Sequence, residues 1–164
     1  MGEFLCVQFG KKNGVPASVI RCHNIYGPRM GTKHVIPEFI LRMPARENPF
    51  RIYGGQETRA FCYVDDAVRA TILVADAPAC AGEIVHIGNP REEVTIEALA
   101  ELVMEQFGDR VEIKECGGRS GSVSRRCPDT SKLKHLTGYE AQVPLKEGLA
   151  RTCKWYLSQA GALR

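Results

Sequence analysis

Asn24 stands in a segment with the residue types needed to hold a polar ligand. The sequence RCHNIYGPRM, residues 21–30, follows an apolar run and contains the loop signal Tyr26-Gly27-Pro28. An asparagine side chain offers both a donor and an acceptor, so it can bond a phosphate oxygen or a sugar hydroxyl. It can instead bond its own turn, and this segment alone leaves both alternatives open.

A second segment, IYGGQETRAFCYVDD at residues 52–66, combines an aromatic ring, two glycines and an arginine. Tyr53 can stack on a base or pack beneath it, and the glycines after it let backbone approach a ligand closely. Arg59 can pair with a diphosphate, because its guanidinium matches two phosphate oxygens at once. The alternative is a hairpin-like turn that carries a surface arginine.

A stretch rich in glycine and serine, CGGRSGSVSRRCP at residues 116–128, carries Arg119, Arg125 and Arg126. It overlaps the third segment, SRRCPDTSKLKHLTGY at residues 124–139. Arg126 precedes a proline by two residues, so a rigid loop can carry its guanidinium toward a phosphorylated ligand. The alternative is a solvated loop. No nucleic-acid partner is expected, because no aromatic residues interleave with these arginines and no long basic stripe exists.

Alternating strands and helices must position these three segments. Short apolar runs next to turn signals predict strands at residues 17–21, 50–53, 61–64, 83–88 and 111–115. Apolar spacing and capping residues predict helices at residues 3–12, 35–43, 65–76, 95–107, 129–136 and 145–158, with Asp65, Thr95 and Asp129 at helix starts. This alternation predicts an α/β fold, in which ligands bind beyond the carboxyl ends of strands.

Taken together and in this order, the segments resemble the extended short-chain dehydrogenases/reductases that modify nucleoside-diphosphate sugars. That family ends a strand with R-x-x-N-x-Y-G-P and later carries Y-G-x-G-x-x-x-R-x-F-x-Y-V-x-D, N-I-G-N and R-x-P-D-x-x-K-x-x-x-x-L-G-[WY]. The matching residues are Arg21, Asn24, Tyr26, Gly27, Pro28, Tyr53, Gly54, Arg59, Phe61, Tyr63, Val64, Asp66, Ile87, Gly88, Asn89, Arg126, Pro128, Asp129, Lys132, Gly138 and Tyr139. Thr137 stands where the family usually has leucine. The similarity spans nearly the whole chain.

The resemblance implies a Rossmann-like α/β fold with a small substrate-binding subdomain. It identifies residues 1–164 as the substrate-binding C-terminal portion of an NAD-dependent epimerase/dehydratase whose N-terminal NAD-binding portion is absent. The family's G-x-x-G-x-x-G loop and Tyr-x-x-x-Lys pair do not occur in this sequence. We therefore expect NAD or NADP to serve the complete enzyme, and we expect this chain alone to bind no cofactor and to be inactive.

The resemblance also implies how a nucleoside-diphosphate sugar would be bound. Asn24 would contact the sugar or the diphosphate. Val35 and Ile36, at the start of a helix, would offer backbone N–H groups to a phosphate. Tyr53 would lie near the base.

The two arginines that match the family pattern, Arg59 and Arg126, would neutralise the diphosphate. His23 occupies a position where many members have phenylalanine, and we interpret it as structural. The sequence assigns no catalytic residue and no metal ligand.

Composition is that of an ordinary globular protein, with 44% hydrophobic and 25% charged residues and a net charge of +3. No apolar run approaches the roughly 20 residues of a membrane span, so a membrane partner is not expected. The seven cysteines are odd in number and form no C-x-x-C pair, which disfavours a disulfide framework or a zinc site. These features predict a cytoplasmic protein, and a homodimer is left open.

Two functions remain to be distinguished. In the first, the chain is part of an enzyme that oxidises a sugar carbon with nicotinamide and then completes epimerisation, elimination or decarboxylation. In the second, it is a non-catalytic module that binds nucleotide sugars or another protein. The nucleotide, the sugar and the outcome of the reaction are not determined by the sequence.

Overall fold

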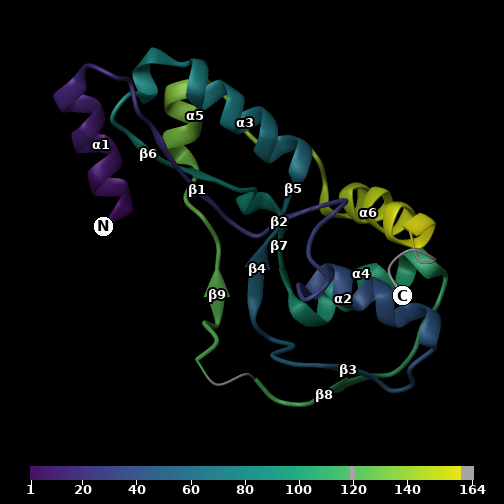
Figure 1. The fold of residues 1–164 in the computed structure, drawn as a ribbon. Coiled ribbons are helices and arrows are strands. Elements are labelled where there is room, and N and C mark those ends of the chain that lie inside the picture. The colour runs from purple at the N-terminus through teal and green to yellow at the C-terminus, as the bar shows by residue number, and fades with distance from the viewer. Residues whose placement is uncertain (119–120, 160–164) are drawn as a thin grey trace.

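A computed structural model describes residues 1–118 and 121–159. Figure 1 shows two lobes joined by several crossings of the chain, with α1, α3 and α5 in one lobe and α2, α4 and α6 in the other. The helices are α1 Gly2–Asn13, α2 Val35–Arg42, α3 Val64–Asp76, α4 Ile96–Phe107, α5 Ser131–Thr137 and α6 Leu145–Gln159. Short 3₁₀ turns cover Met43–Ala45, Pro78–Cys80 and Pro90–Glu92.

The strands are short and pair in small sheets. They are β1 Val19–Cys22, β2 Ile25–Tyr26, β3 Phe50–Ile52, β4 Thr58–Ala60, β5 Cys62–Tyr63, β6 Ile84–Ile87, β7 Glu93–Thr95, β8 Ile113–Glu115 and β9 Arg125–Arg126. Parallel pairs join β1 to β6, β2 to β5, β3 to β8 and β4 to β9, and β4 also pairs with β7 in antiparallel fashion. The predicted α/β class is confirmed.

The first lobe is built on the parallel pair β1–β6. Val85 and Ile87 of β6 are buried with side chains of α3 and α5 in one apolar cluster. The helix α1 lies beside β1 and leaves large apolar side chains exposed, among them Phe4 and Phe9. The strands predicted at 17–21 and 83–88 therefore pair with each other, and their place at the edge of a larger sheet stays a prediction.

The second lobe packs α2, α4 and α6 around a larger apolar core. Phe39 of α2, Phe50 of β3 and Leu99 of α4 are among its buried residues, and the rings of Phe39 and Phe50 meet edge to face at 5.3 Å. The predicted cap at Thr95 is confirmed, because its hydroxyl accepts a hydrogen bond from the backbone N–H of Ala98. This lobe presents β3, β4 and the start of α2 to a common pocket.

The predicted cap at Asp65 is wrong. The helix α3 begins one residue earlier, at Val64, with Tyr63 at the cap position. Asp65 lies in the first turn, where its charge still suits the helix dipole, and its carboxylate faces Arg151 at 3.4 Å. The cap predicted at Asp129 is one residue too early, because Thr130 is the N-cap residue of α5. The Asp129 carboxylate accepts a hydrogen bond from the N–H of Ser131.

In the described part of the chain, no helix is both long and apolar enough to cross a membrane. The seven cysteines are free thiols, and three of them, Cys62, Cys80 and Cys153, are buried. Four strands, β2, β4, β7 and β9, were not expected as such from the sequence, and all four are two or three residues long.

Candidate functional site

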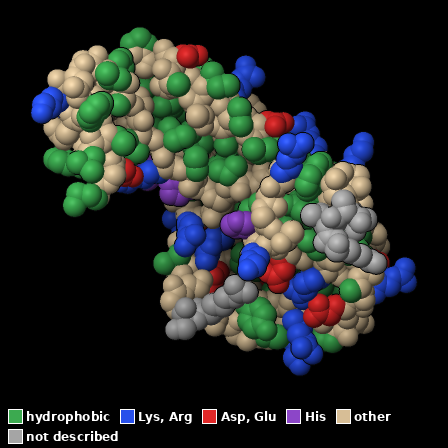
Figure 2. Space-filling view, in the orientation of Figure 1, with side chains coloured by type: hydrophobic (Ala, Val, Ile, Leu, Met, Phe, Trp, Pro, Cys, Tyr) green, Lys and Arg blue, Asp and Glu red, His purple; other side chains and the backbone are tan. Residues whose placement is uncertain are grey.

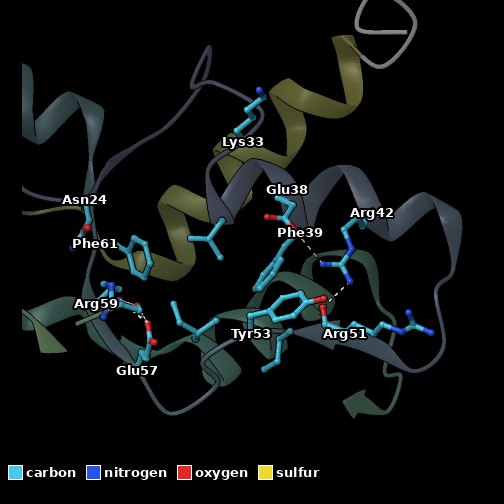
Figure 3. Close-up of a pocket in the computed structure, with 14 residues that line it drawn as sticks. Asn24, Lys33, Glu38, Phe39, Arg42, Arg51, Tyr53, Glu57, Arg59 and Phe61 are labelled. Carbon is cyan, nitrogen blue, oxygen red and sulfur yellow. Dashed lines mark hydrogen bonds and ion pairs between the residues drawn. The ribbon is translucent and has the colours of Figure 1, made fainter. Parts of the chain in front are cut away.

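A pocket of about 220 Å³ opens on the second lobe and is lined by residues that the sequence places far apart. Asn24, Val35, Tyr53 and Arg59 all line it. Figure 3 shows Asn24, Arg59 and Phe61 at one end and Tyr53, Arg42 and Arg51 at the other, with α2 running between them. Four of the six predicted binding residues therefore meet in one place.

Asn24 is held at the pocket by backbone of the neighbouring strands. Its side-chain N–H donates to the backbone carbonyl of Ala60 at 2.9 Å. Its backbone carbonyl accepts a hydrogen bond from the backbone N–H of Cys62 at 3.2 Å. Its φ of 43° is left-handed, a region that asparagine adopts more readily than most residues. Among the described residues no donor contacts its side-chain oxygen, so that acceptor is available to a ligand.

Arg59 forms part of the pocket wall, with 12% of its side chain exposed. Its guanidinium donates to the Glu57 carboxylate at 2.7 Å, to the Ser122 hydroxyl at 3.2 Å and to the Thr58 carbonyl at 2.7 Å. The ion pair with Glu57 partly neutralises the arginine, and Figure 3 shows this contact within the pocket. A bound anion would therefore have to compete with Glu57.

The start of α2 contributes Val35 to the lining, whereas the side chain of Ile36 is fully buried. The cap residue His34 makes no side-chain hydrogen bond to the helix. The first hydrogen bond of the helix runs from the N–H of Glu38 to the carbonyl of His34. The N–H groups of Val35 and Ile36 come before it and therefore have no acceptor within the helix. A phosphate can accept from such groups, in line with the role expected of Val35 and Ile36.

The other end of the pocket combines aromatic and cationic groups. Tyr53 is 49% exposed, so its ring is accessible from solvent. The Arg42 guanidinium lies 4.1 Å from the centre of the Phe50 ring and donates to the Glu47 carboxylate and the Arg51 carbonyl. A planar base could rest against the exposed Tyr53 ring and the Arg42 guanidinium, both of which line the pocket.

Five charged lining residues were missed by the sequence reasoning: Lys33, Glu38, Arg42, Arg51 and Glu57. A signal was present for two of them. Val35, Glu38, Phe39 and Arg42 follow helical spacing, so one face of α2 could have been recognised as pocket-facing. The other three depend on long-range contacts.

Arg126 is not among the pocket-lining residues of the described chain, although its position was expected to converge with Asn24 and Arg59. It is exposed on β9, where it pairs in parallel register with Arg59 of β4. Paired residues of a parallel ladder project to the same face, so Arg126 stands beside the pocket wall. Its neighbour Arg125 is committed to an ion pair with Glu93, and Arg119 lies outside the described residues.

The pocket is more cationic than acidic. Lys33, Arg42, Arg51 and Arg59 line it together with only two carboxylates, Glu38 and Glu57. Figure 2 shows Lys and Arg side chains gathered around the hollow between the two lobes. Within residues 1–118 and 121–159, no three His, Cys, Asp or Glu side chains are placed to hold a metal ion. This chemistry suits an anion joined to a flat ring system.

Comparison with known proteins gives the family. The model of the NAD dependent epimerase/dehydratase family matches residues 1–88, more than half of the chain. UDP-glucuronic acid decarboxylase 1 of Xenopus tropicalis is 36% identical over 159 residues, covering 95% of this chain and 37% of the relative. The chain thus spans well under half the length of that curated relative.

Solved structures agree in fold. UDP-glucose 4-epimerase of Thermotoga maritima, solved with UDP-glucose, superposes with a TM-score of 0.87 at 31% identity, covering 96% of this chain and 51% of that one. The dTDP-glucose 4,6-dehydratase DesIV of Streptomyces venezuelae, solved with NAD and TYD bound, superposes with a TM-score of 0.84 at 29% identity. The match covers 98% of this chain and 49% of that one. Fold, motif order and sequence identity agree, and the chain belongs to the NAD dependent epimerase/dehydratase family, with the Rossmann-like fold of extended short-chain dehydrogenases.

Proposed function

We propose that residues 1–164 are the substrate-binding C-terminal portion of a nucleotide-sugar epimerase, dehydratase or decarboxylase. The observation that carries the proposal is the pocket in which Asn24, Val35, Tyr53 and Arg59 meet. Its ligand is a nucleoside-diphosphate sugar, since the pocket combines aromatic surface, a cationic middle and an amide at one end. Relatives named for UDP-sugar chemistry support this class of ligand.

The base lies at the Tyr53 end, against the Tyr53 ring and the Arg42 guanidinium. The diphosphate lies beside Arg59, toward the Asn24 end, where the first N–H groups of α2, from Val35 and Ile36, face the pocket. The sugar lies at the Asn24 end, nearest the carboxyl ends of β1 and β6. This order follows the chemistry of the lining from one end of Figure 3 to the other.

Arg59 and Arg126 together form the diphosphate clamp. Arg59 exchanges its bond to Glu57 for phosphate oxygens, two of which its guanidinium can contact at once. Arg126 reaches over from β9, where its exposure leaves the guanidinium room to turn toward the bound anion.

The complete enzyme uses NAD or NADP for hydride transfer. Nothing in this sequence matches the glycine-rich loop that holds a dinucleotide, so no residue of this chain is proposed to hold the cofactor. A non-catalytic module that binds nucleotide sugars is the alternative, favoured by the lack of a Tyr-x-x-x-Lys pair in this sequence. A cytoplasmic location and a homodimer stay predictions.

Titration calorimetry with UDP tests the clamp. We expect Arg59→Ala and Arg126→Ala each to weaken UDP binding by about tenfold or more, since a charge-assisted hydrogen bond contributes roughly 1.5–3 kcal/mol. Arg69→Ala is the matched control, because Arg69 is exposed on α3, away from the pocket. Arg151 is a poorer control, since it pairs with Glu147 and Asp65 and lies over the Tyr63 ring.

Uridine separates the clamp from general damage. A nucleoside carries no phosphate, so the two variants are expected to bind it as the unaltered chain does. Equal weakening for uridine and UDP would mean that the arginines act through folding. No measurable UDP binding by the unaltered chain would remove the proposal itself.

A further inference from the structure

Two histidines that the pocket does not use meet at the carboxyl ends of β1 and β6. His23 follows β1 directly, and its backbone N–H continues the ladder by donating to the Ile87 carbonyl at 2.9 Å. His23 Nε2 lies 3.2 Å from Nδ1 of His86 on β6, and the rings stack at 4.8 Å with 27° between their planes. The two imidazoles therefore share one hydrogen bond.

An arginine fixes the direction of that hydrogen bond. Arg21 is anchored to Glu3 of α1 by two bonds of 2.8 and 2.6 Å, and its third nitrogen lies 3.5 Å from Nε2 of His86. A guanidinium only donates, so Nε2 of His86 must accept and its proton sits on Nδ1. That N–H donates to Nε2 of His23, which leaves the proton of His23 on Nδ1.

The surroundings of His23 disfavour its charged form. Burial lowers the pKa of His23, and the positive charges of Arg126 and Arg21 lower it further. Two carboxylates face the pair, but Glu3 is engaged with Arg21 and Asp129 accepts from Ser131. A lowered pKa means that His23 is neutral at pH 7 and becomes charged only at a more acidic pH.

His23 is the residue before Asn24, which lines the proposed sugar end of the pocket. His23 is half-buried and is not itself among the lining residues. The loop after Arg126 packs close by, since a Cβ built on Gly88 would meet Pro128 Cγ at 2.5 Å and His23 Cβ at 3.4 Å. No buried side-chain nitrogen or oxygen of the described residues lacks a partner, so Nδ1 of His23, which forms no hydrogen bond within the described residues, must reach solvent.

We propose that His23 is a sugar-binding residue whose Nδ1–H donates to an uncharged oxygen, a hydroxyl or carbonyl, of the nucleotide sugar. Arg21 and His86 are positioning residues that hold His23 in the Nδ1–H tautomer. The inference rests on the proposed nucleotide-sugar function and adds a residue that recognises the sugar rather than the diphosphate. A neutral donor suits a sugar oxygen, whereas a cationic pair would favour another anion.

The tautomers can be measured without any ligand. Nitrogen-15 NMR of the 164-residue chain at pH 7 is expected to show His23 and His86 both as Nδ1–H, although free histidine in water prefers Nε2–H. Spectra of His23→Gln and His86→Gln assign the signals. Arg21→Met is expected to release His86 toward the common tautomer. An Nε2–H signal for His86 in the unaltered chain would overturn the proposed tautomers and the positioning role of Arg21 and His86.

Affinity measurements then separate the sugar from the nucleotide. His23→Ala is expected to weaken UDP-glucose binding by about tenfold while leaving UDP binding unchanged, and His86→Ala is expected to show the same pattern more weakly. His135→Ala, an exposed histidine on α5, is the control.

An equal loss for UDP and UDP-glucose would overturn the role in sugar recognition. Absence of UDP binding by the unaltered chain would instead overturn the proposed function, and the tautomer measurement would still stand as an independent result.

Discussion

Single residues of the family pattern divide into those that line the pocket and those that hold the fold. Asp66, the last residue of the Y-V-x-D motif, is buried and accepts three hydrogen bonds. They come from the Tyr139 hydroxyl at 2.6 Å, the Gln142 N–H at 3.0 Å and the Val143 N–H at 2.8 Å. Burial and the bond to Asp66 raise the pKa of Tyr139 above its ordinary range. This motif residue therefore ties α3 to the segment before α6.

Replacing Asp66 is expected to destabilise the chain severely. Asp66→Ala leaves a hydroxyl and two backbone N–H groups without an acceptor, which costs at least about 3 kcal/mol of unfolding free energy. Urea unfolding followed by circular dichroism measures the loss. Asp65→Ala on the same helix turn is the control and should change stability by no more than about 1 kcal/mol, because its ion pair with Arg151 is exposed. Similar losses for both variants would refute the argument.

A second residue-scale constraint is the close approach of α6 to an aromatic ring. A Cβ on Gly148 would overlap the Tyr26 hydroxyl and lie 2.9 Å from Tyr63 Cδ2. We expect Gly148→Ala to destabilise by roughly 1–3 kcal/mol, because neither ring can retreat within the packed core. Gly2→Ala in α1 meets nothing within 4 Å and should instead stabilise slightly. Thermal unfolding of the two variants measures both effects. An unfolding midpoint of Gly148→Ala equal to that of the unaltered chain would contradict this packing.

At the scale of elements, the three-stranded sheet β7–β4–β9 depends on a single carboxylate. Glu93 of β7 accepts from the Thr58 hydroxyl of β4 at 2.7 Å and from two nitrogens of Arg125 on β9 at 2.8 Å each. One side chain thus joins all three strands of the β7–β4–β9 sheet. Because β9 also carries Arg126, the position of the proposed clamp depends on this carboxylate.

That dependence gives a pH signature. The hydrogen bonds from Arg125 and then Thr58 lower the pKa of Glu93 from 4.5 to about 2. The stabilisation is complete above the unfolded-state pKa and is lost as pH falls through the folded-state value, so the window runs from about pH 4.5 to about 2. We expect Glu93→Gln to be less stable than the unaltered chain at pH 7 and to match it near pH 2. Glu101→Gln, exposed on α4, should show no such convergence.

Local signals predicted those elements whose ends are fixed by neighbouring residues. The start of α4 at Thr95 is such a case, because the cap bond reaches only three residues along the chain. Asp65 failed as a cap although its residue type is right, because its carboxylate turns to Arg151 of α6, a partner distant in sequence. The strand β9 exists only through its pairing with β4, which no local pattern of two residues can reveal.

The candidate site divides in the same way. Asn24, Tyr53 and Arg59 could be selected from the sequence because each stands in a motif with a recognisable order, and Val35 because it begins a predicted helix. Arg51 is an exposed arginine in a short strand, and its place in the pocket arises from the way β3 packs beside α2. The Glu57 partner of Arg59 was equally hidden, since adjacent charges do not reveal whether they pair.

The whole molecule gathers its pocket from distant parts of the chain, including α2, β3, β4 and α4. A ligand that binds only this assembled arrangement stabilises the folded state by mass action. At a UDP concentration of a hundred times its Kd, we expect about 2.7 kcal/mol of added stability. A rise in the thermal unfolding midpoint with UDP concentration measures it, and Arg59→Ala should need a higher concentration for the same rise. An unchanged midpoint at saturating UDP would contradict binding to the folded pocket.

The strand pair β2–β5 separates the two apolar cores with only two residues on each strand. Its Ile25 and Cys62 side chains belong to the core of the first lobe, and its Tyr26 and Tyr63 side chains belong to the core of the second. This partition works as a shared wall, so neither core can slide without displacing the other. We therefore expect the two lobes to shift together rather than one at a time.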